Sequence, residues 1–158
     1  MVDQVPHFNV LFSSLSAKIA LYDSVKNEIA TISPGIVLLG ADSDKSCIGS
    51  KKVQDFTTIP PIDELKKESL LHYCQKNRVR FIVPTRDGEL PFWAEHQDFL
   101  IFNQIGVMIS SKSAIQICED KYLFAKHLKN APIPAIQTSL SSTSLSSEYD
   151  HFVAKERT

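Results

Sequence analysis

The chain has 158 residues, of which 43% are hydrophobic and 22% are charged, and its formal net charge is −1. This length suits one well-cored domain, or one domain with the beginning of another, and we favour the second organisation. The balanced charge offers no attraction for nucleic acid, and the sequence has neither an apolar run of about 20 residues nor a signal peptide, so we expect a cytoplasmic protein without nucleic-acid or membrane partners.

The cysteines and histidines show no spacing that predicts a metal site. The cysteines, Cys47, Cys74 and Cys118, are widely separated and lack a CxxC pair, which favours free thiols over disulfides or zinc ligands. The histidines also lack metal-ligand spacing, and residues 94–98 read AEHQD, which is not the HExxH motif of zinc proteases. We therefore expect no metal ligands in this sequence.

The first predicted elements are a strand, a serine-rich turn and a helix. The apolar residues 9–12 form the strand, and apolar positions between residues 19 and 25 follow a helical period. Ser13, Ser14 and Ser16 occupy the turn, where capping the helix is the simpler role and hydrogen bonding to a ligand is the alternative. This turn contains no glycine and so lacks the GxGxxG motif, which disfavours a nicotinamide or flavin site.

Two further strands end in acidic or proline-rich segments. Residues 36–39 form the second strand, and Asp42 follows it at a position that resembles the ribose-binding acid of nucleotide folds, although a turn or cap role is more common. Residues 55–59 form a short strand that two prolines end. Asp63 is then predicted to cap a helix over residues 64–77.

The stretch of residues 79–91 is the most informative part of the sequence. Residues 79–83 read VRFIV, a run of β-branched and aromatic residues typical of a buried strand, and a proline ends it. Thr85 can then accept hydrogen bonds from turn amides, while Asp87 and Glu89 place negative charge at the start of a helix. Because ligands bind beyond the carboxyl ends of strands in open α/β sheets, we expect this loop to lie at the functional site.

The chain then continues with alternating helices and strands. The remaining predicted elements are a helix over residues 90–104, a strand over 106–109 and a helix over 120–129. The helix over residues 90–104 is expected to break near residues 97–98. A short helix capped by Ser111 or Ser113 is expected before the helix over 120–129. This alternation predicts right-handed βαβ units, and therefore a Rossmann-like open, mostly parallel sheet with helices on both faces.

The C-terminal part of the sequence differs in character. Pro132 and Pro134 fix an extended connector, and residues 139–147 contain six serines, which predicts a flexible loop. Residues 151–155 begin a strand, but no further element follows to pair with it before Thr158. We therefore expect a second domain that is cut short.

These residues together resemble the ATP-grasp superfamily, and most closely its carbamoyl-phosphate synthase large-subunit-like branch. The resemblance extends over nearly the whole chain, including residues 40–42 and 82–91, and it is most specific over 119–122, Leu128 and 132–134. In that family an Asp-Lys pair opens the helix that joins the pre-ATP-grasp domain to the ATP-grasp domain. This helix is followed by a connector that contains a proline. A strand that bears a nucleotide-contacting lysine comes next.

The resemblance implies a domain organisation and an activity. Residues 1–118 would be the pre-ATP-grasp domain, and residues 119–158 the linker helix and the truncated start of the ATP-grasp domain. The parent protein would be an ATP-dependent ligase that activates a small-molecule carboxylate as an acyl phosphate and couples it to an amine or a thiol. Lys121 and Lys155 would contact ATP, because ammonium groups beside phosphate oxygens stabilise the transferring charge.

Two departures from the family pattern limit what this chain can do. The family commonly has a proline and a glycine-rich phosphate loop after the second lysine, whereas residues 156–158 read ERT and end the sequence. Gly88 lies where family members often have another acid. ATP and Mg²⁺ are therefore expected as cofactors of the parent protein, without tight binding by this chain, which we predict to be inactive by itself. Its catalytic residues are not predicted.

Two other functions stay open from the sequence. One is a stand-alone Rossmann-like module that binds a small acidic or amino-acid ligand near Ser13, Asp42, Thr85 and Asp87. These four residues and Glu89 are the candidate substrate-binding residues. The other is a protein-interaction module that exposes an aromatic patch of Phe92, Trp93 and Phe99, although core packing is the more common role of such residues. A homodimer is kept as an alternative to a monomer.

Overall fold

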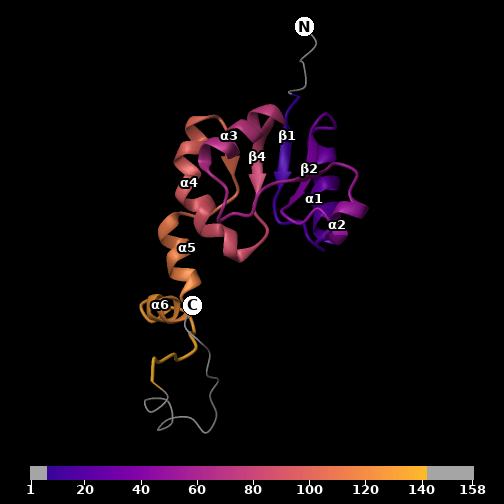
Figure 1. The fold of residues 1–158 in the computed structure, drawn as a ribbon. Helices are drawn as coiled ribbons and strands as arrows, with labels where there is room; N and C mark the ends of the chain where they lie inside the picture. The colour runs from indigo at the N-terminus through magenta and orange to yellow at the C-terminus, as the bar shows by residue number, and fades with distance from the viewer. Residues whose placement is uncertain (1–6, 142–158) are drawn as a thin grey trace. The chain divides into compact units, whose positions relative to one another are not determined.

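The computed structural model describes residues 7–141 (Figure 1). The chain divides into two compact units, residues 1–109 and 110–158, and each unit is described by itself. The domain boundary predicted between residues 118 and 119 stays a prediction. The predicted strand over residues 151–155, with Lys155, and most of the serine-rich segment lie outside the described residues.

A five-stranded, all-parallel sheet forms the centre of the first unit. Its order is β3-β2-β1-β4-β5, with strands β1 (Asn9–Phe12), β2 (Val37–Asp42), β3 (Phe56–Thr58), β4 (Val79–Val83) and β5 (Gly106–Val107). In the middle of the sheet, Leu11 of β1 lies opposite Leu39 of β2 and Ile82 of β4. This arrangement confirms the predicted open Rossmann-like α/β fold.

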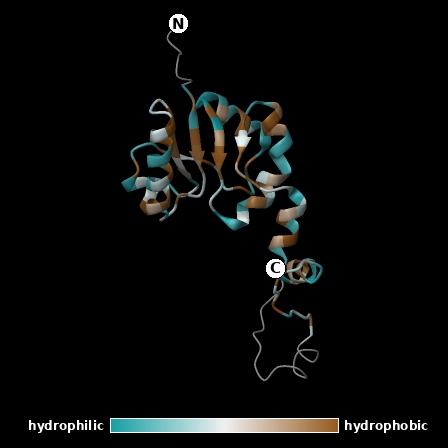
Figure 2. Ribbon diagram, turned by 180° about the vertical axis from the view of Figure 1, so that it is seen from behind, coloured by the Kyte–Doolittle hydropathy of each residue, from teal (hydrophilic) through white to brown (hydrophobic). Residues whose placement is uncertain are grey.

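Helices cover both faces of the sheet, as predicted, because its strands present apolar side chains to both sides. The helices of this unit are α1 (Ile19–Ile32), α2 (Ile48–Lys52), α3 (Lys67–Lys76), the 3₁₀ helix η1 (Asp87–Glu89) and α4 (Leu90–Phe102). On one face Phe12 packs edge-to-face on Tyr22 of α1. On the other face Leu11 belongs to a cluster that includes Cys74 of α3 and Trp93 of α4. Figure 2 accordingly shows the central strands as hydrophobic.

Helix α4 confirms one expectation about its aromatic residues and contradicts two others. Trp93 is fully buried and Phe92 and Phe99 pack partly buried against the same cluster, which confirms a core role. The predicted exposed patch of these three side chains is therefore not formed. The helix is also continuous over its whole length, so the predicted break near residues 97–98 is wrong.

Helix α3 begins later than predicted, and Asp63 does not cap it. The N-cap position is Lys66, and the chain before it forms a turn in which the Glu64 amide donates to the Pro61 carbonyl at 3.0 Å. This turn uses the residues that were assigned to the first helical turn. Helix α2 was not predicted, because its five residues are too few to show an apolar period.

The second unit contains α5 (Lys112–Glu119) and α6 (Lys121–Leu128), both started by side-chain caps. The Ser111 Oγ accepts a hydrogen bond from the Ala114 amide at 3.3 Å, so Ser111 is the cap of α5. The Asp120 Oδ1 accepts hydrogen bonds from the amides of Tyr122 at 2.9 Å and Leu123 at 3.1 Å. The expectation that Asp120 opens this helix is confirmed.

The buried thiol of Cys74 predicts a loss of stability at high pH. Burial raises the pKa of this thiol from 9.0 to about 12. Above pH 9.0 the unfolded chain releases the proton while the folded chain retains it, so the stabilisation is complete below that pH and is lost as the pH rises towards 12. We expect the free energy of unfolding to fall by up to about 1.4 kcal/mol per pH unit from this group.

Urea denaturation above and below pH 9.0 measures this slope. The variant Cys74→Ala should lose it, whereas Cys118→Ala, at an exposed position of α5, should keep it. Tyr22 adds a similar slope in every variant, because burial raises its pKa to about 12. Equal slopes in the two cysteine variants would show that the Cys74 thiol is not responsible.

Candidate ligand-binding site

The sheet order places a topological switch point between β1 and β4. The chain proceeds from β1 outwards to β2 and β3, and then adds β4 and β5 on the other side of β1. The loops that follow β1 and β4 therefore leave the same edge of the sheet at neighbouring positions, which is where ligands bind in open α/β folds. The loop of residues 84–89, which the sequence singled out, lies at this edge.

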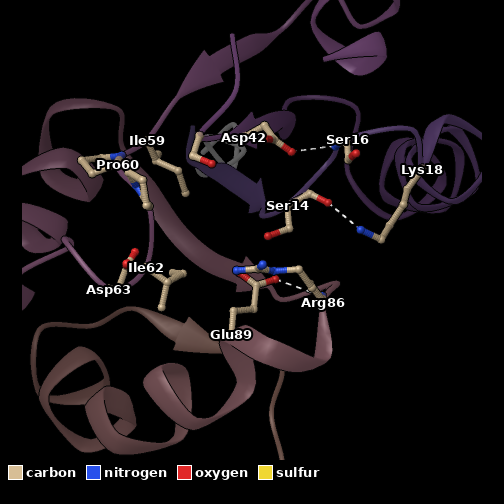
Figure 3. A pocket seen from close by; sticks show the side chains of 12 residues that line it. Ser14, Ser16, Lys18, Asp42, Ile59, Pro60, Ile62, Asp63, Arg86 and Glu89 are labelled. Atoms are coloured by element: carbon tan, nitrogen blue, oxygen red, sulfur yellow. Dashed lines mark hydrogen bonds between the residues drawn. The ribbon is translucent and has the colours of Figure 1, made fainter. Parts of the chain in front are cut away.

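A cavity of about 360 Å³ lies at this edge, within the first unit (Figure 3). Its lining comes from the segments that follow four strands, and consists of Ser14, Ser16, Lys18, Asp42, Ser43, residues 59–63, Arg86 and Glu89. Of the residues predicted from the sequence, Asp42 and Glu89 line the cavity directly. Ser13 and Thr85 lie next to it in the same loops, whereas Asp87 is exposed in η1 and does not line it.

Glu89 links the two loops at the switch point. Its Oε1 accepts hydrogen bonds from the Ser13 hydroxyl at 2.9 Å, the Thr85 amide at 2.9 Å and the Arg86 amide at 3.0 Å. Neither Glu89 nor Ser13 has exposed surface. A buried carboxylate that accepts three donors from two loops fixes their separation, and with it the width of the cavity.

Thr85 adds a second connection between these loops. Its Oγ1 donates towards the Ser13 carbonyl at 2.5 Å and the Ser14 carbonyl at 3.1 Å. We had expected this hydroxyl to accept hydrogen bonds from the amides of the following turn. That expectation is wrong, because the Glu89 carboxylate takes the amides of Thr85 and Arg86 instead.

The β1–α1 loop has an unusual backbone that other parts of the unit hold in place. Ser14 and Ser16 have φ angles of 49° and 42°, values that residues other than glycine seldom adopt. The Asp42 Oδ2 accepts a hydrogen bond from the Ser16 amide at 2.7 Å, and the Lys18 Nζ donates to the Ser14 carbonyl at 2.7 Å. Positive φ angles at non-glycine residues recur at functional sites, where the surrounding structure maintains them.

The serines of this loop do not cap α1, contrary to the simpler prediction. The N-cap position is Lys18, and no side chain there accepts a hydrogen bond from the helix. Instead α2, which the sequence did not reveal, supports the loop through the amide of Gly49, which donates to the Ser16 carbonyl at 2.7 Å. A Cβ at Gly49 would lie 2.6 Å from the Leu15 side chain, so only glycine permits this close approach.

Sequence reasoning missed the two cations of the cavity, Lys18 and Arg86. Figure 3 shows the Arg86 guanidinium extending into the cavity. Among residues 7–141, no ion pair joins either cation to a carboxylate. Arg86 could have been predicted from its position between Thr85 and Asp87, in the acidic loop after β4.

In the second unit, Lys121 occupies the first position of α6 and is exposed. This placement agrees with a helix opened by an Asp-Lys pair, but it does not test whether Lys121 contacts ATP. The other proposed ATP-contacting residue, Lys155, lies outside the described residues.

No protein-family model matches this sequence, and no curated protein matches it either. Within residues 7–141, no group of three or more His, Cys, Asp or Glu side chains is placed to hold a metal ion. In the same part of the chain, no helix is both long enough and apolar enough to cross a membrane. The functional interpretation therefore rests on the sequence motifs, the fold and the cavity.

Proposed function

We propose that this chain is the N-terminal part of an ATP-dependent ligase of the ATP-grasp type. The observation that supports this most strongly is the order of its elements: an open parallel sheet with an acidic loop after β4, followed by a helix that Asp120 and Lys121 open. The parent reaction activates a carboxylate as an acyl phosphate with Mg-ATP and transfers the acyl group to an amine or a thiol.

The proposal assigns the nucleotide site to the parent protein, which includes residues beyond the described range. Of the two lysines assigned to ATP, Lys121 is the one within the described range, and that range contains no cluster of three or more His, Cys, Asp or Glu side chains placed to hold a metal ion. In the proposal Lys121 and Lys155 neutralise phosphate charge in the parent protein, while this chain alone does not turn over. ATP and Mg²⁺ are thus cofactors of the parent.

Phosphate release from Mg-ATP tests this assignment. The purified 158-residue chain should release no phosphate, whereas the protein encoded by the complete reading frame should do so when a carboxylate and an amine or thiol are present. In that protein Lys121→Ala should lower the rate by about a hundredfold, the usual effect of removing a group that stabilises transition-state charge. Lys112→Ala in α5 is the control and should leave the rate unchanged. Turnover by the 158-residue chain would refute the prediction that it is inactive alone, and an unchanged rate in Lys121→Ala would count against the assignment.

A second candidate function is the binding of a small polar ligand by the first unit alone. The cavity at the switch point favours it, because Glu89 is one of the residues around the cavity and its buried Oε2 has no hydrogen-bond partner within the described residues. Buried polar atoms are rarely left unpaired in folded proteins, so this acceptor is expected to meet a donor, and in this second candidate function the ligand supplies it.

A further inference from the structure

We propose that the cavity at the switch point binds a basic α-amino acid of the size of lysine, an inference that rests on the small-ligand function proposed above. Such a ligand carries an ammonium and a carboxylate at one end and a second cation at the other. The lining of the cavity contains a group of opposite charge for each of these charges.

The α-ammonium and α-carboxylate match Glu89 and Arg86. Among residues 7–141, the Oε2 of Glu89 has no hydrogen-bond partner, and the guanidinium of Arg86, which also lines the cavity, has no ion pair. An ammonium and a carboxylate that share one carbon atom suit two protein groups of opposite charge that line the same cavity. The guanidinium can bind a carboxylate through two parallel hydrogen bonds, and the ligand ammonium can donate to Oε2.

Lys18 strengthens the selection for a carboxylate at this end of the cavity. Its Nζ donates to the Ser14 carbonyl, which holds the ammonium group at the cavity and leaves further donors for a ligand. Figure 3 shows Lys18 on the same side of the cavity as the Arg86 backbone. Two cations that line the cavity therefore provide a site for one carboxylate.

Apolar residues and acids line the rest of the cavity. Ile59, Pro60 and Ile62 form a wall suited to the methylene groups of a side chain. In Figure 3 Asp63 lies across the cavity from Lys18, and no hydrogen bond or ion pair engages it within the described part of the chain. A terminal ammonium that follows an aliphatic stem would reach this carboxylate.

The charges of the lining decide between classes of ligand. Three carboxylates, of Asp42, Asp63 and Glu89, face two cations, those of Lys18 and Arg86. This excess of negative charge repels phosphate-rich ligands such as nucleotides and favours a ligand with two positive charges and one negative charge. Lysine has this charge pattern at neutral pH.

Isothermal titration calorimetry of the 158-residue chain with L-lysine and three analogues tests the inference. L-norleucine lacks the terminal ammonium, Nα-acetyl-L-lysine lacks the α-ammonium charge, and L-lysinamide lacks the carboxylate. We expect L-lysine to bind and each analogue to bind at least about tenfold more weakly, which corresponds to the loss of one charged contact. Norleucine binding as tightly as lysine would overturn the inference.

Variants at exposed positions locate the site without disturbing the buried network. Asp63→Asn should reduce lysine affinity to that of norleucine and leave norleucine affinity unchanged, while Asp98→Asn on α4 should alter neither. If inorganic phosphate or ATP binds and lysine does not, the amino-acid inference fails while a small-ligand function stands. If none of these compounds binds, both fail.

Discussion

Replacing Glu89 by alanine is expected to lower the free energy of unfolding by about 3 kcal/mol, because three donors would lose their acceptor at once. The Ser13 hydroxyl and the amides of Thr85 and Arg86 all donate to one carboxylate oxygen of this fully buried residue. The β1–α1 and β4–α4 loops would separate, and the cavity between them would lose its shape. Urea denaturation of Glu89→Ala measures the effect.

The matched control for this prediction is Glu89→Gln. Glutamine retains a carbonyl oxygen that can replace Oε1 as the acceptor of the same three hydrogen bonds, so we expect a loss of about 1 kcal/mol or less. A loss below about 1 kcal/mol in Glu89→Ala itself would show that the carboxylate does not hold the two loops together.

Replacing Trp93 by alanine is expected to cost about 3 to 5 kcal/mol of stability, the usual range for removing a large aromatic side chain from a core. Trp93 is among the largest fully buried side chains, and it packs against Phe92 with ring centroids 5.1 Å apart. Its removal would leave a cavity between α4 and the sheet. Denaturant unfolding of Trp93→Ala gives the value.

Phe102→Ala is the control on the same helix, because 88% of the Phe102 surface is exposed. Its stability should lie within about 0.5 kcal/mol of the original chain. In addition, an aqueous quencher should leave the fluorescence of Trp93 in the folded protein almost unchanged. Strong quenching, or an equal loss of stability in Trp93→Ala and Phe102→Ala, would show that Trp93 is exposed. Such a result would support the protein-interaction module.

The strands could be predicted from the sequence because each is a short, apolar run that ends in a turn residue. Residues 79–83 are the clearest case, since a proline stops the run and an acidic loop follows. Parallel pairing then follows from the intervening helices, and the position of the site follows from the strand ends. These inferences need only local patterns and general rules of α/β topology.

The contacts within the site could not be predicted, because they join residues that are distant in the sequence. Glu89 and Ser13 are 76 positions apart, and a glutamate at the start of a helix is ordinarily exposed. Local rules assigned Glu89 to the helix dipole and Ser13 to capping, whereas in the folded chain the Ser13 hydroxyl donates to the Glu89 carboxylate.

The most direct test of the ligase assignment is the nucleotide sequence of the source gene beyond the codon for Thr158. We expect the reading frame to continue into a loop rich in glycine and serine, and then into acidic residues suited to bind Mg²⁺. A stop codon directly after Thr158 would contradict the assignment, and the small-ligand function of the first unit would then be the one to pursue.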